Sequence, residues 1–232
     1  MTGFDFERAR TPEAKRVRQD AILAAAARLA TADGVREVTA SAIAEAVGMH
    51  KSAMLRYFET REDIFLQLAT QAWEDWSVAV RAELAELAGR PSAGRAEWNR
   101  TAGEVAAVLA RSLAERPLFC DLLAHTPLNL ERNVSLERVK AFKTGAIAVV
   151  ADVSAALCTV TPLRLDQAHS VVATATAMAG AMWQMAAPTT NLREFYRAEP
   201  ELAHAVVEVE PRLTDIIEAL LTGYATRSTR PE

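Results

Sequence analysis

Residues 39–58 read TASAIAEAVGMHKSAMLRYF, and this stretch decides the fold. Its pattern predicts two short helices, 39–47 and 51–57, separated by Gly48. Thr39 suits the N-cap of the first helix, because its hydroxyl oxygen can accept a hydrogen bond from a backbone amide there. Gly48 permits the positive φ of a tight turn. The stretch therefore predicts two short helices that cross at a steep angle.

The apolar residues of this stretch meet the packing demands of a helix-turn-helix. Ala44 is small where the two helices must approach closely. The larger apolar residues at inward positions are Ile43, Val47, Met49, Met54 and Tyr57. In such a unit the second helix lies in the major groove of DNA, and its first residues face the base edges. DNA binding is therefore the leading functional hypothesis.

The predicted DNA contacts form two groups. The candidate base readers are His50, Lys51, Ser52 and Ala53, at the start of the second helix. The candidate phosphate contacts are Thr39, Ser41, Arg56, Tyr57 and Arg61. Two alternatives stay open, because His50 is equally plausible as a solvent-facing cap and Arg61 as a plain surface charge.

The rest of the chain also predicts helices and no strand. A first helix is expected over 12–32, with an inward stripe of Val17, Ala21, Ala24, Ala25, Arg28 and Leu29, ending at Gly34. A long fourth helix begins near Arg61. Later helices are expected at 96–115, 118–125, 136–159, 165–187, 200–208 and 212–225. The prediction is an all-α chain with a helix-turn-helix domain over 1–60 and a larger helical domain over 61–232.

Composition and charge fit a globular protein of the cytoplasm. Half of the 232 residues are hydrophobic and the net charge is −4, but Arg8 to Arg61 holds ten basic against six acidic residues. The beginning of the chain lacks an apolar leader, and Cys120 and Cys158 lack metal-ligand spacing. Residues 170–192 carry no charge and could span a bilayer, but their Ala, Thr, Met and Gln content favours a buried helix. We expect no membrane partner, metal or cofactor.

Residues 22–65 resemble the DNA-binding domain of the TetR family. The resemblance lies in Ile22, Gly34, Thr39, Ile43-Ala44, Val47-Gly48-Met49-His50, Tyr57-Phe58 and Arg61-Glu62-Asp63-Ile64. Three positions depart from the family pattern, which usually has Ser at His50, Gly at Ser52 and Tyr at Leu55. Leu55 cannot donate the phosphate hydrogen bond that the family tyrosine implies, and Arg56 is its candidate substitute. These changes predict an altered operator sequence.

The resemblance implies a homodimeric repressor that binds operator DNA and is released by a small molecule. Two apolar helices near the end of the chain suit a four-helix bundle with a second copy. The predicted dimer-interface residues are Val171, Ala175, Met178, Met182, Trp183, Leu213, Ile217, Leu220, Leu221 and Tyr224. The alternative is that both helices close the core of the monomer. Activation instead of repression also remains open.

A ligand pocket is expected among the middle helices by the same resemblance. Its candidate residues combine aromatic and apolar groups with a few polar tips: Trp98, Phe119, Leu122, His125, Phe142, His169 and Met178. They suit a mostly apolar ligand, although residues of these types are more often core than ligand contacts.

The sequence argues against an enzyme. It contains no Gly-rich phosphate loop, no His-Glu-x-x-His, no zinc-spaced Cys pair and no Gly-x-Ser-x-Gly. The competing hypothesis is a helical protein that binds small molecules or partners and whose DNA-binding domain has lost operator recognition. Ser52 and Leu55 motivate that alternative.

Overall fold

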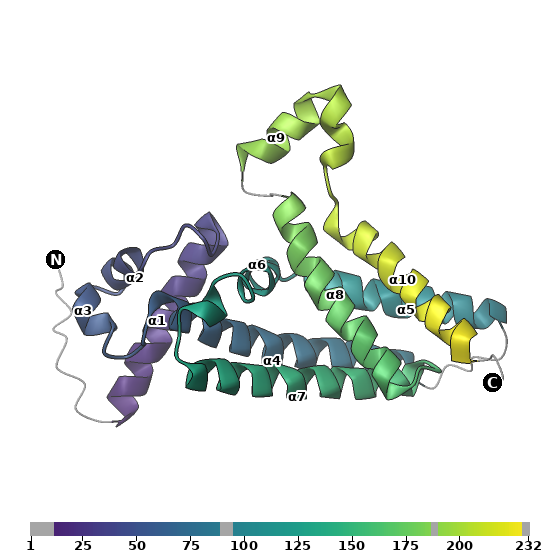
Figure 1. Cartoon of the computed structure of the whole chain (residues 1–232), viewed down its shortest axis with the longest axis horizontal. Helices are drawn as coiled ribbons and strands as arrows, with labels where there is room; N and C mark the ends of the chain where they lie inside the picture. The colour runs from purple at the N-terminus through teal and green to yellow at the C-terminus, as the bar shows by residue number, and fades with distance from the viewer. Residues whose placement is uncertain (1–11, 89–94, 187–189, 229–232) are drawn as a thin grey trace.

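The computed structural model describes residues 12–88, 95–186 and 190–228. Within these ranges every regular element is a helix, which confirms the all-α prediction. Helices α1 to α3 form a small N-terminal unit, here called the head, and the later helices form the body (Figure 1). The head lies at one end of the elongated molecule, and the chain ends near the other.

The helix bounds follow the sequence pattern closely. The head contains α1 Pro12–Asp33, α2 Ala40–Ala46 and α3 Lys51–Met54. The body contains α4 Arg61–Leu87, α5 Arg95–Ala114, α6 Pro117–His125, η1 Leu130–Arg132, α7 Leu136–Val160, α8 Leu165–Ala186, α9 Asn191–Ala198, η2 Pro200–Ala205 and α10 Val209–Ser228. Helix α3 is shorter than predicted, since it ends at Met54. The prediction missed α9, and residues 200–205 form a 3₁₀ helix.

The buried face of α1 matches the predicted stripe at Ala25 and in part at the half-buried Leu29, but differs at its other positions. Its buried residues include Ile22, Leu23 and Ala26, whereas Val17 is 61% exposed and Arg28 lies in solvent. Ala21 and Ala24 are also exposed. The large aliphatic side chains Ile22 and Leu23 gain the most from burial, so they set the rotation of this alanine-rich helix.

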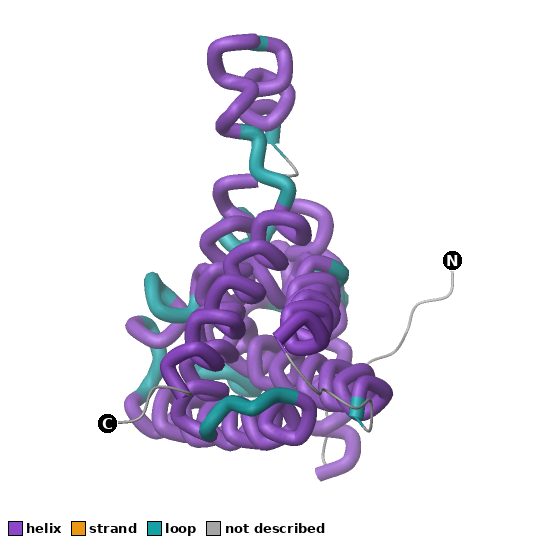
Figure 2. The backbone as a smooth tube through the Cα atoms, turned by 90° about the vertical axis from the view of Figure 1, so that its right-hand side faces the viewer, coloured by secondary structure: helices purple, strands orange, loops and turns teal. Residues whose placement is uncertain are grey.

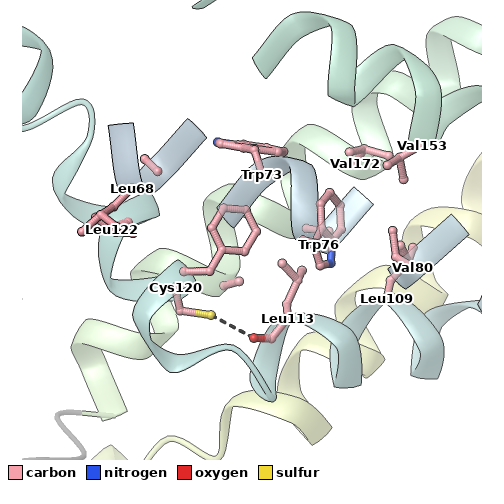
Figure 3. Packing of buried hydrophobic residues seen from close by; sticks show 14 of the residues in the cluster. Leu68, Trp73, Trp76, Val80, Leu109, Leu113, Cys120, Leu122, Val153 and Val172 are labelled. Carbon is pink, nitrogen blue, oxygen red and sulfur yellow. Dashed lines mark hydrogen bonds between the residues drawn. The ribbon is translucent and has the colours of Figure 1, made fainter. Parts of the chain in front are cut away.

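Aromatic side chains from α4 and α6 fill the centre of the body (Figure 3). The ring of Trp73 packs edge-on against Trp76 and Phe119, with centroids 5.7 and 5.2 Å away. The Trp76 indole donates a hydrogen bond to Ser112 Oγ at 3.0 Å.

The thiol of Cys120 is buried in the same core. Cys120 donates from Sγ to the carbonyl of Leu113 at 3.2 Å, and burial beside Asp121 raises its pKa to about 12. Its thiol is therefore unreactive near neutral pH.

Most of the predicted dimer-interface residues belong to the core of the single chain. Helix α8 packs against α6 and α7, and α10 packs along α5 and α8. Six predicted interface residues are consequently buried within one copy: Val171, Ala175, Met182, Leu213, Ile217 and Leu221. The other four, Met178, Trp183, Leu220 and Tyr224, are half-buried against that core. The six buried residues therefore lie in the core of the single chain, as the monomer-core alternative expects.

Helix α9 and η2 form an arm that stands away from the body (Figures 1 and 2). Arg193 fastens the base of the arm by donating to the carbonyls of Ala186 and Val207 at 3.0 and 3.2 Å. It also forms an ion pair with Glu208 at 2.7 Å. Among the described side chains of the arm, the large apolar ones that are exposed are Leu192 and Phe195.

The uncharged stretch 170–192 contributes the body helix α8, as its composition predicts, although 187–189 lie outside the described residues. Among the described residues α7 alone is long and apolar enough to cross a membrane by length and composition. It runs beside α4 and contacts α8.

Candidate DNA interface and head–body junction

Local hydrogen bonds fix the geometry of α2, the turn and α3. Thr39 Oγ1 accepts from the Ala42 amide at 3.1 Å and caps α2. Gly48 has a φ of 64°, and the next amide, that of Met49, donates to the carbonyl of Ala44 at 2.8 Å. His50 caps α3, since its Nδ1 accepts from the Ser52 amide at 3.4 Å. Because Nδ1 is used as an acceptor, Nε2 is the ring atom left to donate outward.

The structure brings most of the predicted DNA contacts to the exposed surface of the head. The exposed ones are Thr39, Ser41, His50, Lys51, Ser52, Leu55 and Arg56. Ala53 and Tyr57 are half-buried, and Met54 and Phe58 anchor the unit from inside. The surface of α2 and α3 thus offers hydroxyls, an imidazole and two cations, which are the groups that bind phosphates and base edges.

Arg61 has a different role from the predicted phosphate contact. Its guanidinium donates to the backbone carbonyls of Val35 and Val38, and Nη1 lies 3.1 Å from Glu62 Oε1. Its side chain is only 16% exposed and lies over the ring of Phe65. The guanidinium therefore ties the loop after α1 to the start of α4 and is largely shielded from solvent.

Asp121 joins the same loop to the body from the other side. Its Oδ2 accepts from the Val35 amide at 2.6 Å, and its Oδ1 accepts from Gln184 Nε2 at 2.7 Å. His125 Nε2 lies 3.4 Å from Oδ1. Burial alone would raise the pKa of Asp121, but the hydrogen bonds from His125, Val35 and Gln184 outweigh it and hold the pKa below its ordinary value. Asp121 is thus a buried, ionised link between α1, α6 and α8.

A second junction connects the end of the head to the start of α7. Glu59 accepts from the amide and the hydroxyl of Ser135 at 3.0 and 2.9 Å. Thr60 Oγ1 donates to the carbonyl of Asn133, and Arg138 lies 3.4 Å from the buried Asp63. The hydrogen bonds from Ser135 lower the pKa of Glu59. The body therefore holds the head at two separate places.

Two cavities include residues from the predicted ligand pocket. His125 lines a cavity of about 210 Å³ between the end of α1, α6 and α8. Phe119 lines a mainly apolar cavity of about 260 Å³ beside Ala72 and Leu118. The other predicted pocket residues line neither cavity: Trp98, Leu122, Phe142, His169 and Met178. Leu122 and Phe142 are core residues, as the alternative interpretation expects, and His169 Nδ1 lies 3.1 Å from the carbonyl of Leu165 in its own helix.

Sequence reasoning missed Asp121, Gln184, Glu59 and Ser135 because each is an ordinary polar residue whose partner is distant in the chain. The one local signal was Asp121 within the otherwise apolar run 117–124. A charge at such a position must find partners when it is buried. In the parts of the chain that the structure covers, no group of acidic, histidine or cysteine side chains is arranged to hold a metal.

Two protein families match the chain, one for each part. Residues 22–68 match "Bacterial regulatory proteins, tetR family", and residues 70–228 match "Tetracyclin repressor-like, C-terminal domain". No curated protein sequence matches the chain.

Several solved structures share the fold. The fatty acid degradation regulator FadR from Bacillus halodurans is 16% identical, with a TM-score of 0.53 over 93% of this chain and 97% of that one. A putative TetR-family regulator from Mesorhizobium loti is 12% identical, with a TM-score of 0.55 over 92% and 97%. FadR from Bacillus subtilis, solved with stearoyl-CoA, is 15% identical, with a TM-score of 0.53 over 88% and 98%. At these identities the likeness establishes the fold.

Proposed function

Since the chain belongs to the tetR family of bacterial regulatory proteins, we propose that it is a repressor that binds a pseudo-palindromic operator as a homodimer. Proteins of this family are DNA-binding transcriptional regulators and not enzymes. The observation that carries the proposal is the exposed surface of α2 and α3, held rigid by two capped helices and a glycine turn. We assign this surface to a DNA-binding domain over 1–60 and the regulatory and dimerisation functions to 61–232.

The predicted contact residues of the head have two roles in the proposed complex. His50, Lys51 and Ser52, with the adjacent Ala53, face the base edges in the major groove. Thr39, Ser41, Arg56 and Tyr57 contact phosphates, while Leu55 offers an apolar contact to a thymine methyl group. Arg61 supports the head from inside.

The proposed dimer uses the outward faces of α8 and α10. On α8 the exposed residues Ala173, Ala177 and Ala181 recur every four positions and form one stripe. On α10, which packs against α8, Ala219 and Gly223 are exposed. Small side chains allow the helices of two copies to approach closely. A two-fold axis there would set the two heads about 34–36 Å apart, as successive major grooves require.

The proposed effector is a small, mostly apolar molecule that binds in the body and weakens operator binding. The apolar cavity beside Phe119 lies next to both α1 and α4 and supports such a site. B. subtilis FadR was solved with stearoyl-CoA, so acyl-CoA is a second effector class to test, although it is larger than this cavity of about 260 Å³. A coupling of about 1–3 kcal/mol would change operator affinity about 5- to 150-fold. We expect the protein to act in the cytoplasm, where its operator is.

The test is to select genomic DNA fragments with the purified protein and to sequence those that bind. The proposal predicts enrichment of a pseudo-palindrome whose half-sites are about one helical turn apart. If no site is enriched, with or without acyl-CoA, the head has lost operator recognition and the protein is a helical binding protein.

A further inference from the structure

The cavity of about 210 Å³ at the head–body junction has walls from the end of α1 with the following loop, from α6, from α8 and from Thr190. The head contributes the end of α1 and the following loop, including Asp33, Arg36 and Glu37. The body contributes Asp121 and His125 from α6, and Trp183 and Gln184 from α8. This volume lies below the roughly 300–1,000 Å³ of pockets for drug-sized ligands, so its occupant must be small.

The interior of this cavity offers hydrogen-bond acceptors. The carboxylate of Asp121 has about four lone-pair sites, and within the described residues Val35, Gln184 and His125 approach it. His125 Nε2 lies 3.4 Å from Asp121 Oδ1, so Nδ1 is the second ring nitrogen, which accepts a hydrogen bond when it carries no proton. That Nδ1 is buried and has no hydrogen-bond partner within the described residues. A ligand with several N–H donors would satisfy both groups.

The charge and the aromatic wall of the cavity favour a cation. Three carboxylates line it, those of Asp33, Glu37 and Asp121. Arg36 and Glu37 lie 3.9 Å apart with side chains 82% and 70% exposed, so they pair with each other at the solvent edge, and the remaining negative charge of the lining is that of Asp33 and Asp121. The indole of Trp183, also in the lining, offers the aromatic surface on which a cation binds well.

We propose that this cavity binds a small organic cation, an ammonium or amidinium compound with a compact apolar body, and that its occupation weakens operator binding. The site is separate from the apolar cavity beside Phe119. A cation at the remaining lone-pair site of Asp121 draws carboxylate charge away from the Val35 amide, which belongs to the loop between α1 and α2 of the head. Cation binding therefore loosens one of the two junctions that position the head. The effect on the operator rests on the proposed function, whereas cation binding itself does not.

The test compares cations with neutral molecules of the same shape. Benzamidine, benzylamine and phenylguanidine are titrated into the full chain by calorimetry beside benzamide, benzyl alcohol and phenylurea. We expect at least one cation to bind at least about tenfold more tightly than its neutral partner, because a buried charge-assisted contact is lost in the latter. Asp121→Asn should weaken that binding by a similar factor.

Because Asp121→Asn alters a buried group, a surface variant keeps the test independent of folding. The pair Asp33→Asn, Glu37→Gln changes two exposed side chains of the lining and should weaken binding about threefold. The matched control Glu137→Gln, Asp152→Asn removes two exposed acids of α7 and should leave binding unchanged.

The proposed site would be overturned by any of three results. These are equal binding of cations and their neutral partners, absence of cation binding, and unchanged binding in the double lining variant. Operator affinity with and without the tightest cation is then measured separately. A cation that binds but leaves operator affinity unchanged overturns the coupling. A chain that binds the cation but no operator retains the site and contradicts the proposed repressor function.

Discussion

Arg61 and Asp121 hold the same short loop of the head from opposite sides. Arg61 donates to the carbonyls of Val35 and Val38, and Asp121 accepts from the amide of Val35. The loop follows Gly34, whose φ of 89° ends α1 in a conformation that favours glycine. Single residues thus determine how the head is placed on the body.

At the residue scale, Arg61→Ala should destabilise the fold and leave the salt dependence of DNA binding unchanged. It removes hydrogen bonds from a charged donor to two part-buried carbonyls, which corresponds to about 1–3 kcal/mol of unfolding free energy. Urea unfolding and a salt titration of DNA binding measure the two effects. If Arg61→Ala kept its stability but showed a smaller salt dependence of DNA affinity, Arg61 would be a phosphate contact after all.

Glu59 should make stability depend on acid pH. Its pKa is lowered from 4.5 by the hydrogen bonds from Ser135, so its stabilising effect is present above that value and is lost as pH falls through the lowered pKa. The stability difference between the wild type and Glu59→Gln should shrink below about pH 4, as measured by urea unfolding over a pH series. A constant difference down to about pH 3 would show that the carboxylate charge has no part in this junction.

At the scale of elements, α6 and α8 cross closely at Gly180. A Cβ there would lie 2.8 Å from the backbone nitrogen of Ala124, which a side-chain movement cannot relieve. Since α6 carries Asp121 and His125, the spacing of these two helices also sets the junction with the head.

Gly180→Ala should therefore cost about 1–3 kcal/mol and change operator affinity. The matched control is Gly145→Ala on α7, where nothing lies within 4 Å of the added Cβ. That control should gain about 0.5–1 kcal/mol, because alanine loses less backbone entropy than glycine in a helix. Thermal unfolding compares the two, and equal effects would contradict the tight crossing.

Sequence patterns predicted where the helices lie better than they predicted which side of each helix is buried. The caps Thr39 and His50 and the glycine turn are local, so the head was predictable from residues 39–58. Helix α1 is rich in alanine on every side, so the predicted stripe placed the wrong side of the helix against the core at most of its positions. Helix α9 was missed because it lacks buried residues and follows a proline.

The apolar stripes of α8 and α10 show a second limit. A stripe that faces the chain's own core and one that faces another copy have the same periodicity. The structure separates them, since Val171 and Ile217 are buried within one copy while Ala177 is exposed. The junction residues needed distant partners and could not be predicted from the sequence.

At the scale of the whole molecule, Ala177→Glu should disrupt the proposed dimer. It places a charge in the middle of the exposed α8 stripe, and an unpaired charge in an interface is costly. The matched control Ala155→Glu changes an exposed alanine on α7. Sedimentation should give monomers for the first variant and dimers for the second. The reverse result would assign the interface to α7.

The central claim is that the surface of α2 and α3 binds operator DNA. The most direct test is a salt titration of operator affinity for the wild type and for the double variant Lys51→Ala, Arg56→Ala, with Lys140→Ala on α7 as the control. The double variant should bind at least about tenfold more weakly, with a salt slope reduced by about one to two, while Lys140→Ala behaves as the wild type. Unchanged affinity and slope in the double variant would contradict the assignment of this surface to DNA.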